Sequence, residues 1–165
     1  MRVLFILTLI LLSACTQSTN PGMGGDFAIY RLQDTILTAA EVWDKPLDHL
    51  VLASAPFLTV RDVISYRWST HGFTVTASVD SQLAAMKLVH GFMGGIPFVV
   101  VAGGQKIYLG AFWYAYSSMI PQVPYIDVIL DPHTIHNTPS VLVTDDKRTD
   151  ERIYRALQGA GVLIE

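Results

Sequence analysis

The chain has a single cysteine, no run of basic residues and no familiar catalytic motif. Each of these shortages argues against a class of structure or function. Cys15 is the only cysteine among 165 residues, so no internal disulfide can form. There are 11 Lys and Arg residues against 14 Asp and Glu residues, and no basic cluster is present to neutralise a phosphate backbone. Neither Gly-x-Ser-x-Gly nor Ser-x-x-Lys occurs, and the glycine pairs lack the spacing of a phosphate loop. We therefore expect no nucleic-acid partner and no cofactor, and we favour binding or scaffolding over catalysis.

The N-terminus combines a positive charge, a short apolar run and a small-residue motif. Arg2 precedes residues 3–12, which are apolar apart from Thr8 and are fewer than the ~20 residues that a membrane-spanning helix needs. The motif that follows, Leu12-Ser13-Ala14-Cys15, resembles the lipobox of bacterial lipoproteins. The resemblance implies that 1–14 is a cleaved signal peptide and that Cys15 is lipidated, which would attach the protein to a membrane. The alternative is an ordinary secretory signal with an incidental cysteine.

Residues 15–25 are predicted to be the lipidated cysteine and a flexible tether, because they carry no charge and no apolar period. The residue after the cysteine is Thr16 rather than the Asp that favours inner-membrane retention in lipoproteins of double-membraned bacteria. The resemblance thus implies the cell envelope, and the outer membrane facing the periplasm for a Gram-negative source. Loss of Arg2 with the signal lowers the formal net charge from −3 to −4. Residues 26–165 have the usual length of one domain.

Strand-like and helix-like segments are interspersed, which predicts an α+β sandwich with β-hairpins. Gly103-Gly104 suits a tight turn between strands at 97–102 and 105–110, and the unbroken apolar run of the first strand places it inside a sheet. Further strands are expected at 27–32, 50–53, 64–68, 73–77 and 125–130, a loop at 131–140, and a brief pairing at 141–143. Helical segments are expected within 34–43, at a turn capped by Thr59 with Asp62, from Ser78 or Asp80 to about 89, and from the cap Asp150 to about 158.

Two further resemblances concern the mature chain. Residues 57–110 are expected to form, in this order, a Leu-Thr-x-x-Asp-Val turn, two strands, a helix and a hairpin with the sequence Val-Ala-Gly-Gly-Gln-Lys-Ile-Tyr. This order of elements resembles the first extracytoplasmic domain of SecD. That likeness implies an α/β sandwich related to ferredoxin-like folds and a binding or scaffolding role without catalytic residues. The stretch from Gly95 to Ser118 is similar to a family of uncharacterised, often secreted or lipidated bacterial proteins.

A carboxylate and two imidazoles within six residues form the best metal candidate in the sequence. Asp131, His133 and His136 carry ligand types that divalent ions accept, and Asp145 or Asp146 could add another. This site would support the alternative function, a small metal-dependent or glycan-acting envelope enzyme. The opposing interpretation is a polar surface loop whose histidines make hydrogen bonds.

The densest aromatic cluster contains Trp113, Tyr114 and Tyr116, which could stack on a glycan. Aromatic residues directly after a buried hairpin can instead fill the core. The expected partner is accordingly a glycan or an envelope protein. In the latter case an unpaired edge strand at 27–32 could accept a partner strand.

Overall fold

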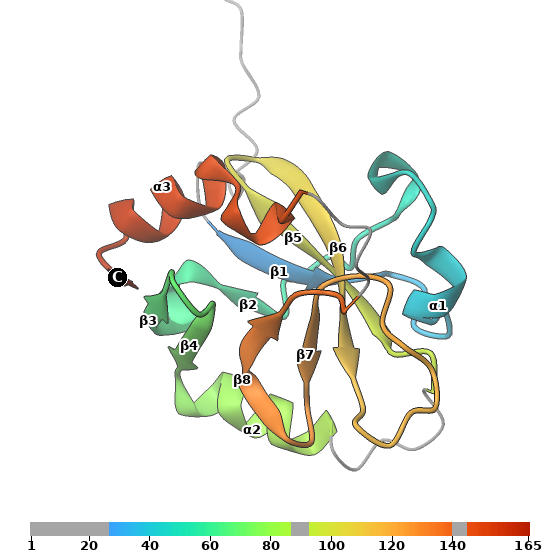
Figure 1. The fold of residues 1–165 in the computed structure, drawn as a ribbon. Helices are drawn as coiled ribbons and strands as arrows, with labels where there is room; N and C mark the ends of the chain where they lie inside the picture. Colours follow the sequence, from blue (N-terminus) through green and yellow to red (C-terminus); the bar gives the residue numbers. More distant parts are fainter. Residues whose placement is uncertain (1–26, 87–92, 140–144) are drawn as a thin grey trace, which may run out of the picture.

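The computed structural model describes residues 27–86, 93–139 and 145–165. They form a curled nine-stranded sheet flanked by short helices, so the chain has the α+β class that the sequence predicts (Figure 1). The strand order is β2-β1-β5-β6-β7-β8-β4-β3-β9. The strands are β1 Ala28–Arg31, β2 Leu58–Thr59, β3 Val63–Arg67, β4 Gly72–Val75, β5 Ile96–Ala102, β6 Gln105–Trp113, β7 Tyr125–Asp127, β8 Asp131–His136 and β9 Leu163–Ile164. The helices are α1 Ala39–Val42, α2 Ala77–Met86 and α3 Glu151–Gly159, with 3-10 turns η1 Leu47–His49, η2 Val60–Asp62 and η3 Lys147–Thr149.

The β5–β6 hairpin forms, and β5 lies inside the sheet, as the sequence predicts. Gly103 and Gly104 have φ angles of 57° and 73°, which a side chain would disfavour. β5 lies between β1 and β6, and all of its residues are buried. The consecutive apolar positions of this strand are therefore explained by cover on both faces.

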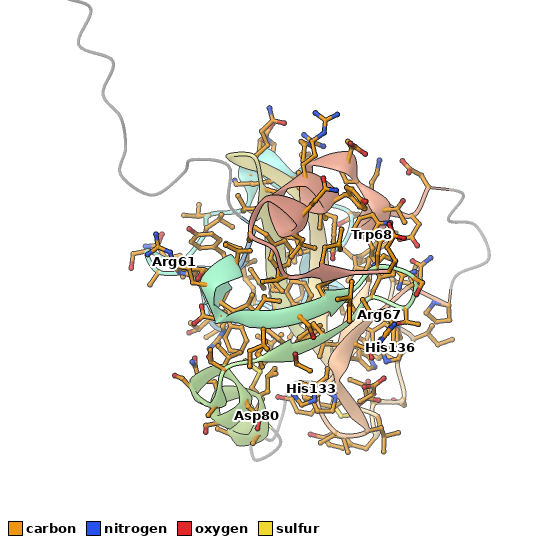
Figure 2. All side chains as sticks on the ribbon, turned by 90° about the vertical axis from the view of Figure 1, so that its left-hand side faces the viewer. Arg61, Arg67, Trp68, Asp80, His133 and His136 are labelled. Atoms are coloured by element: carbon orange, nitrogen blue, oxygen red, sulfur yellow. The ribbon has the colours of Figure 1, made fainter. Side chains whose placement is uncertain are left out.

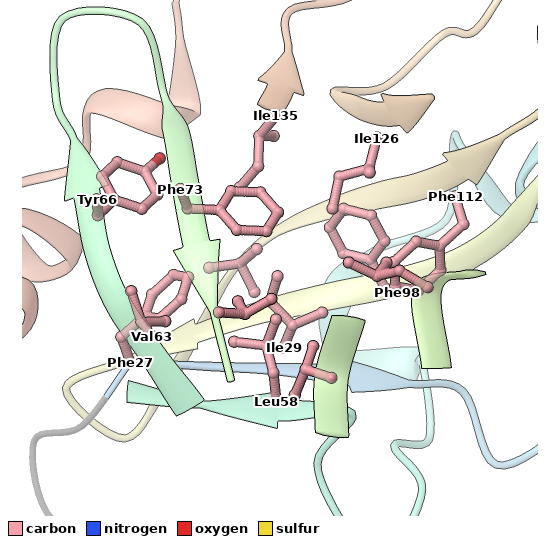
Figure 3. Packing of buried hydrophobic residues seen from close by; sticks show 14 of the residues in the cluster. Phe27, Ile29, Leu58, Val63, Tyr66, Phe73, Phe98, Phe112, Ile126 and Ile135 are labelled. Carbon is pink, nitrogen blue, oxygen red and sulfur yellow. The ribbon is translucent and has the colours of Figure 1, made fainter. Parts of the chain in front are cut away.

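The sheet curls around one main hydrophobic core. Strands from both ends of the strand order contribute to it, because Leu58 of β2 and Tyr66 of β3 belong to the same buried cluster. Figure 3 shows these side chains converging with those of the central strands. The rings of Phe27 and Tyr66 meet edge to face with centroids 6.3 Å apart. A second buried cluster lies on the other side of β5 and includes Val42 of α1 and Trp113.

Local capping signals locate the helical segments well. The Thr59 amide donates to the Asp62 carboxylate at 2.8 Å, which confirms the capped turn at η2. Asp150 accepts a hydrogen bond from the Arg152 amide at 2.9 Å and begins α3, also as predicted. α2 begins at Ala77, and its predicted extension beyond Met86 lies outside the described residues.

Two predicted strands and one predicted loop need correction. Residues 50–53 form no strand: Leu50 closes the 3-10 turn η1, and Leu52 makes only an isolated bridge to Leu32. The strand at 125–130 ends at Asp127, because its carboxylate accepts the amide protons of residues 129 and 130 and turns the chain. The expected loop at 131–140 contains β8, whose pairing with both β4 and β7 overrides the turn-like composition. The expected pairing at 141–143 lies outside the described residues.

The strand expected to be a free edge is internal. β1 pairs antiparallel with β2 on one side and with β5 on the other. Its backbone groups are therefore used within the sheet, and the reading of 27–32 as an open edge for a partner strand is wrong. β9, which no local pattern indicates, pairs parallel with β3 at one end of the strand order.

Candidate functional site

A cavity of about 610 Å³ opens between the end of β1, the loop at 53–57 and α2. Its volume is within the range typical of small-molecule sites. Its outer wall exists because the 53–57 loop leaves β1: Ala53 donates to the Arg31 carbonyl at 2.9 Å and Phe57 to the Ile29 carbonyl at 2.8 Å. The five residues 53–57 therefore lie opposite the three residues 29–31, so the loop bulges away from β1. Pro56, within the loop, has no N–H to donate to β1. We call this cavity the Arg31 cleft.

Arg31 is the unusual residue of the cleft. It continues the alternating row of Phe27 and Ile29, both of which belong to the main core, so a cation occupies an inward-facing register position. Its Nε is buried and has no hydrogen-bond partner within the described residues. No ion pair found among those residues includes Arg31, and the nearby Asp34 instead accepts from the Ile36 amide at 3.1 Å. A guanidinium thus lines a cavity without a carboxylate to neutralise it.

The remaining lining is uncharged over the part of the chain that the structure describes. Four side chains bring polar groups, namely Gln33, Thr35, Ser54 and Gln82, and the others are apolar, including Phe57 and Met86. No histidine, cysteine or carboxylate side chain among the described residues joins a hydroxyl group there to form a nucleophile and base. The cleft can therefore bind a ligand that has an anionic group and an apolar part.

The predicted aromatic ligand site is divided between the core and the surface. Trp113 and Tyr114 are buried, with 5% and 0% of their surface exposed, while Tyr116 is 51% exposed. The Tyr114 hydroxyl donates to the carbonyl of Met86 at 3.1 Å and so ties the end of α2 to the sheet. Burial, then repulsion from Tyr116, raises the pKa of Tyr114, and the positive charge of Arg31 acts in the opposite direction. Tyr114 therefore supports the wall of the Arg31 cleft.

The predicted metal ligands are not brought together at one point. Tyr125 registers with His136 and Asp127 with Asp131, so β8 bulges between its two ends, and His136 Nε2 lies 3.1 Å from Asp131. His133, within the bulge, turns instead to Asp80 of α2, at 3.0 Å (Figure 2). Over residues 27–86, 93–139 and 145–165, no three His, Cys, Asp or Glu side chains are placed to share an ion. His133 and His136 therefore pair with two different carboxylates.

A histidine is enclosed in the core. His71, 5% exposed and with a φ of 55°, places Nδ1 3.0 Å from the Tyr66 hydroxyl. Burial, and secondarily the Arg148 cation, lowers the pKa of His71 to about 4. Burial also raises the pKa of Tyr66, so the phenol keeps its proton and can donate it to a neutral imidazole. Arg148 binds Asp146 at 2.6 Å, and this interaction lowers the pKa of Asp146. The cluster fixes the β3–β4 turn.

Sequence reasoning missed the Arg31 cleft. A signal was present, since a cation interrupts the alternating apolar row of 27–31. The loop at 53–57 and α2 gave no such signal, because their approach depends on tertiary pairing. Comparison with known families, with curated proteins and with solved structures found no match. Within the described residues, no helix is long and apolar enough to cross a bilayer.

Proposed function

We propose that the protein is a lipid-anchored protein of the cell envelope whose folded domain binds a ligand in the Arg31 cleft without transforming it. The single observation that carries the binding role is that Arg31 lines a 610 Å³ cavity, while its buried Nε has no hydrogen-bond partner within the described residues. A buried N–H donor without an acceptor is costly, and a bound anion that accepts from the guanidinium would offset that cost. The absence of a nucleophile and base among the described lining residues supports binding over catalysis.

The anchor in this proposal is the lipid on Cys15, with the outer membrane facing the periplasm as the location in a Gram-negative source. The support is the Leu12–Cys15 motif and the uncharged tether that follows it. Several acyl chains, at ~0.8 kcal/mol per buried methylene, would hold the domain firmly. Growth of producing cells with a labelled fatty acid should label the wild-type protein and leave Cys15→Ser unlabelled. Equal label in both proteins would overturn the anchor and leave the cleft untouched.

The SecD-like arrangement is proposed for residues 57–110 alone. Its support is the order of elements, because the capped turn η2 is followed by β3, β4, α2 and the β5–β6 hairpin. Among the other strands of the sheet, β1 precedes that segment in the chain and β7, β8 and β9 follow it. We therefore carry over the binding or scaffolding role and no specific partner.

Binding in the cleft is tested by thermal unfolding in the presence of a panel of small anions and uncharged compounds. A ligand that binds the folded state raises the melting temperature by an amount that increases with the ratio of its concentration to its dissociation constant. The matched comparison is Ala85→Trp, which places a large side chain in the cleft wall. A stabilisation that Ala85→Trp abolishes supports the proposal. A stabilisation that persists unchanged in Ala85→Trp would place the ligand elsewhere.

A further inference from the structure

We propose that Arg31 is the anion-binding residue of the cleft and that the natural ligand combines one carboxylate or phosphate group with a short aliphatic body. This inference rests on the proposed binding role and adds the chemical class of the ligand. It follows from the charge of the cleft, the size of its side chains and a comparison with the other half-buried arginine of the core.

The comparison with Arg148 separates a structural arginine from a binding one. The side chain of Arg148 is 13% exposed, and each of its three guanidinium nitrogens donates a hydrogen bond: Nε and one Nη donate to Asp146 at 2.9 and 2.6 Å, and the other Nη donates to the carbonyl of Ile135 at 2.7 Å. This is how a fold satisfies a guanidinium that it buries. Arg31 also has a buried Nε, yet it has neither a carboxylate nor a carbonyl acceptor among the residues that the structure describes. Its donors remain for an external anion.

The anion should be of the planar or tetrahedral oxygen type. A guanidinium presents paired N–H donors in a fork that matches two oxygens of a carboxylate or a phosphate. No described residue that lines the cleft carries a negative charge. A ligand with a positive group beside its anion, such as a free amino acid, would therefore find no counter-charge there. The cleft is matched to a net negative ligand.

The apolar residues of the cleft indicate the chemistry of the uncharged part of the ligand. Three alanines, Ala53, Ala55 and Ala85, leave room along the wall, and Met86 adds a flexible apolar surface. The Phe57 ring is held against the Phe112 ring with centroids 4.9 Å apart, so it forms a fixed surface. These groups suit an unbranched aliphatic chain, which gains free energy in proportion to the apolar area that it buries.

The test measures binding of three probes to the full lipidated chain in non-ionic micelles, with micelles alone as the blank. The probes are hexanoate, hexyl phosphate and hexan-1-ol, which share the aliphatic body and differ in charge. We expect both anions to bind at least about tenfold more tightly than the alcohol. Arg31→Met should reduce the affinity for the anions to that of the alcohol, and Arg31→Lys should lie between, because a lysine offers no fork. A preference for one anion identifies whether the ligand is a carboxylate or a phosphate.

The matched control is Arg61→Met, since Arg61 is exposed on η2 and does not line the cleft (Figure 2). It should change neither binding nor stability. Arg31→Met should not lower the ligand-free melting temperature, because the Nε of Arg31 has no hydrogen-bond partner and no ion pair among the described residues includes Arg31. A lower melting temperature would show that Arg31 is structural and would overturn the inference. Equal binding of all three probes would overturn the anion assignment and keep the cleft, whereas binding of none would overturn the proposed function itself.

Discussion

Acidification should destabilise the protein through His71 before the ion-paired carboxylates Asp146 and Asp150 are protonated. The imidazole is enclosed in the core beside Tyr66, and burial lowers its pKa from 6.5 to about 4. Because the folded-state pKa is the lower one, the unfolded chain takes up the proton first as the pH falls. Stability is therefore complete above pH 6.5 and is lost progressively between pH 6.5 and 4. With 1.36 kcal/mol for each pKa unit, the loss amounts to about 3 kcal/mol.

Urea unfolding at a series of pH values from 7 to 4, on the wild type and on His71→Asn, measures this loss. Asparagine tolerates the positive φ of 55° at this position and does not titrate. The free-energy difference between the two proteins should shrink by about 3 kcal/mol across that window. Interactions of Arg148 and Arg152 lower the pKa of Asp146 and Asp150 below 3.8, so these carboxylates lose their contribution only at still lower pH. A parallel decline of both proteins between pH 6.5 and 4 would refute the assignment to His71.

Two further perturbations test the fold and the histidines of β8. Gly110→Ala should lower the free energy of unfolding, measured in urea, by about 1–3 kcal/mol, because a Cβ there would lie 2.4 Å from the Phe98 ring. The control Gly159→Ala should not destabilise the protein, because a Cβ at that position would have nothing within 4 Å. Equal effects of the two substitutions would contradict the packing. Calorimetry with zinc, copper and nickel should show no micromolar binding, since His133 and His136 pair with different carboxylates. Micromolar binding that His133→Ala/His136→Ala removes would restore the metal-dependent alternative.

The features that short stretches of sequence determine could be predicted, and those that depend on distant pairing could not. The Gly103-Gly104 turn and the Asp150 cap each act within a few residues, and both are found. β9 forms only because Leu163 registers with Tyr66, and no local pattern near the C-terminus contains that information. β8 is similar, since its pairing with β4 and β7 gives strand structure to a segment with the composition of a loop.

The same distinction applies to the candidate site. Proximity in sequence suggested that Asp131, His133 and His136 act together, but the bulge in β8 directs His133 to α2 and leaves His136 with Asp131. The lipidation of Cys15 stays a prediction, because it lies outside the described residues. Arg31 could have been noticed as a cation in an apolar row. Its cavity could not, because the opposing wall comes from segments that approach only in the folded sheet.

The most direct test of the account is a map of amide chemical shifts in the ¹⁵N-labelled protein during titration with hexyl phosphate. The account predicts changes confined to the three segments around the cleft, 31–35, 53–57 and 82–86. Arg31→Met should abolish them while leaving the rest of the spectrum unchanged. Changes centred on residues 113–123, where a separate hollow of about 410 Å³ lies beside Trp43, or no changes at all, would contradict the claim that the Arg31 cleft is the binding site.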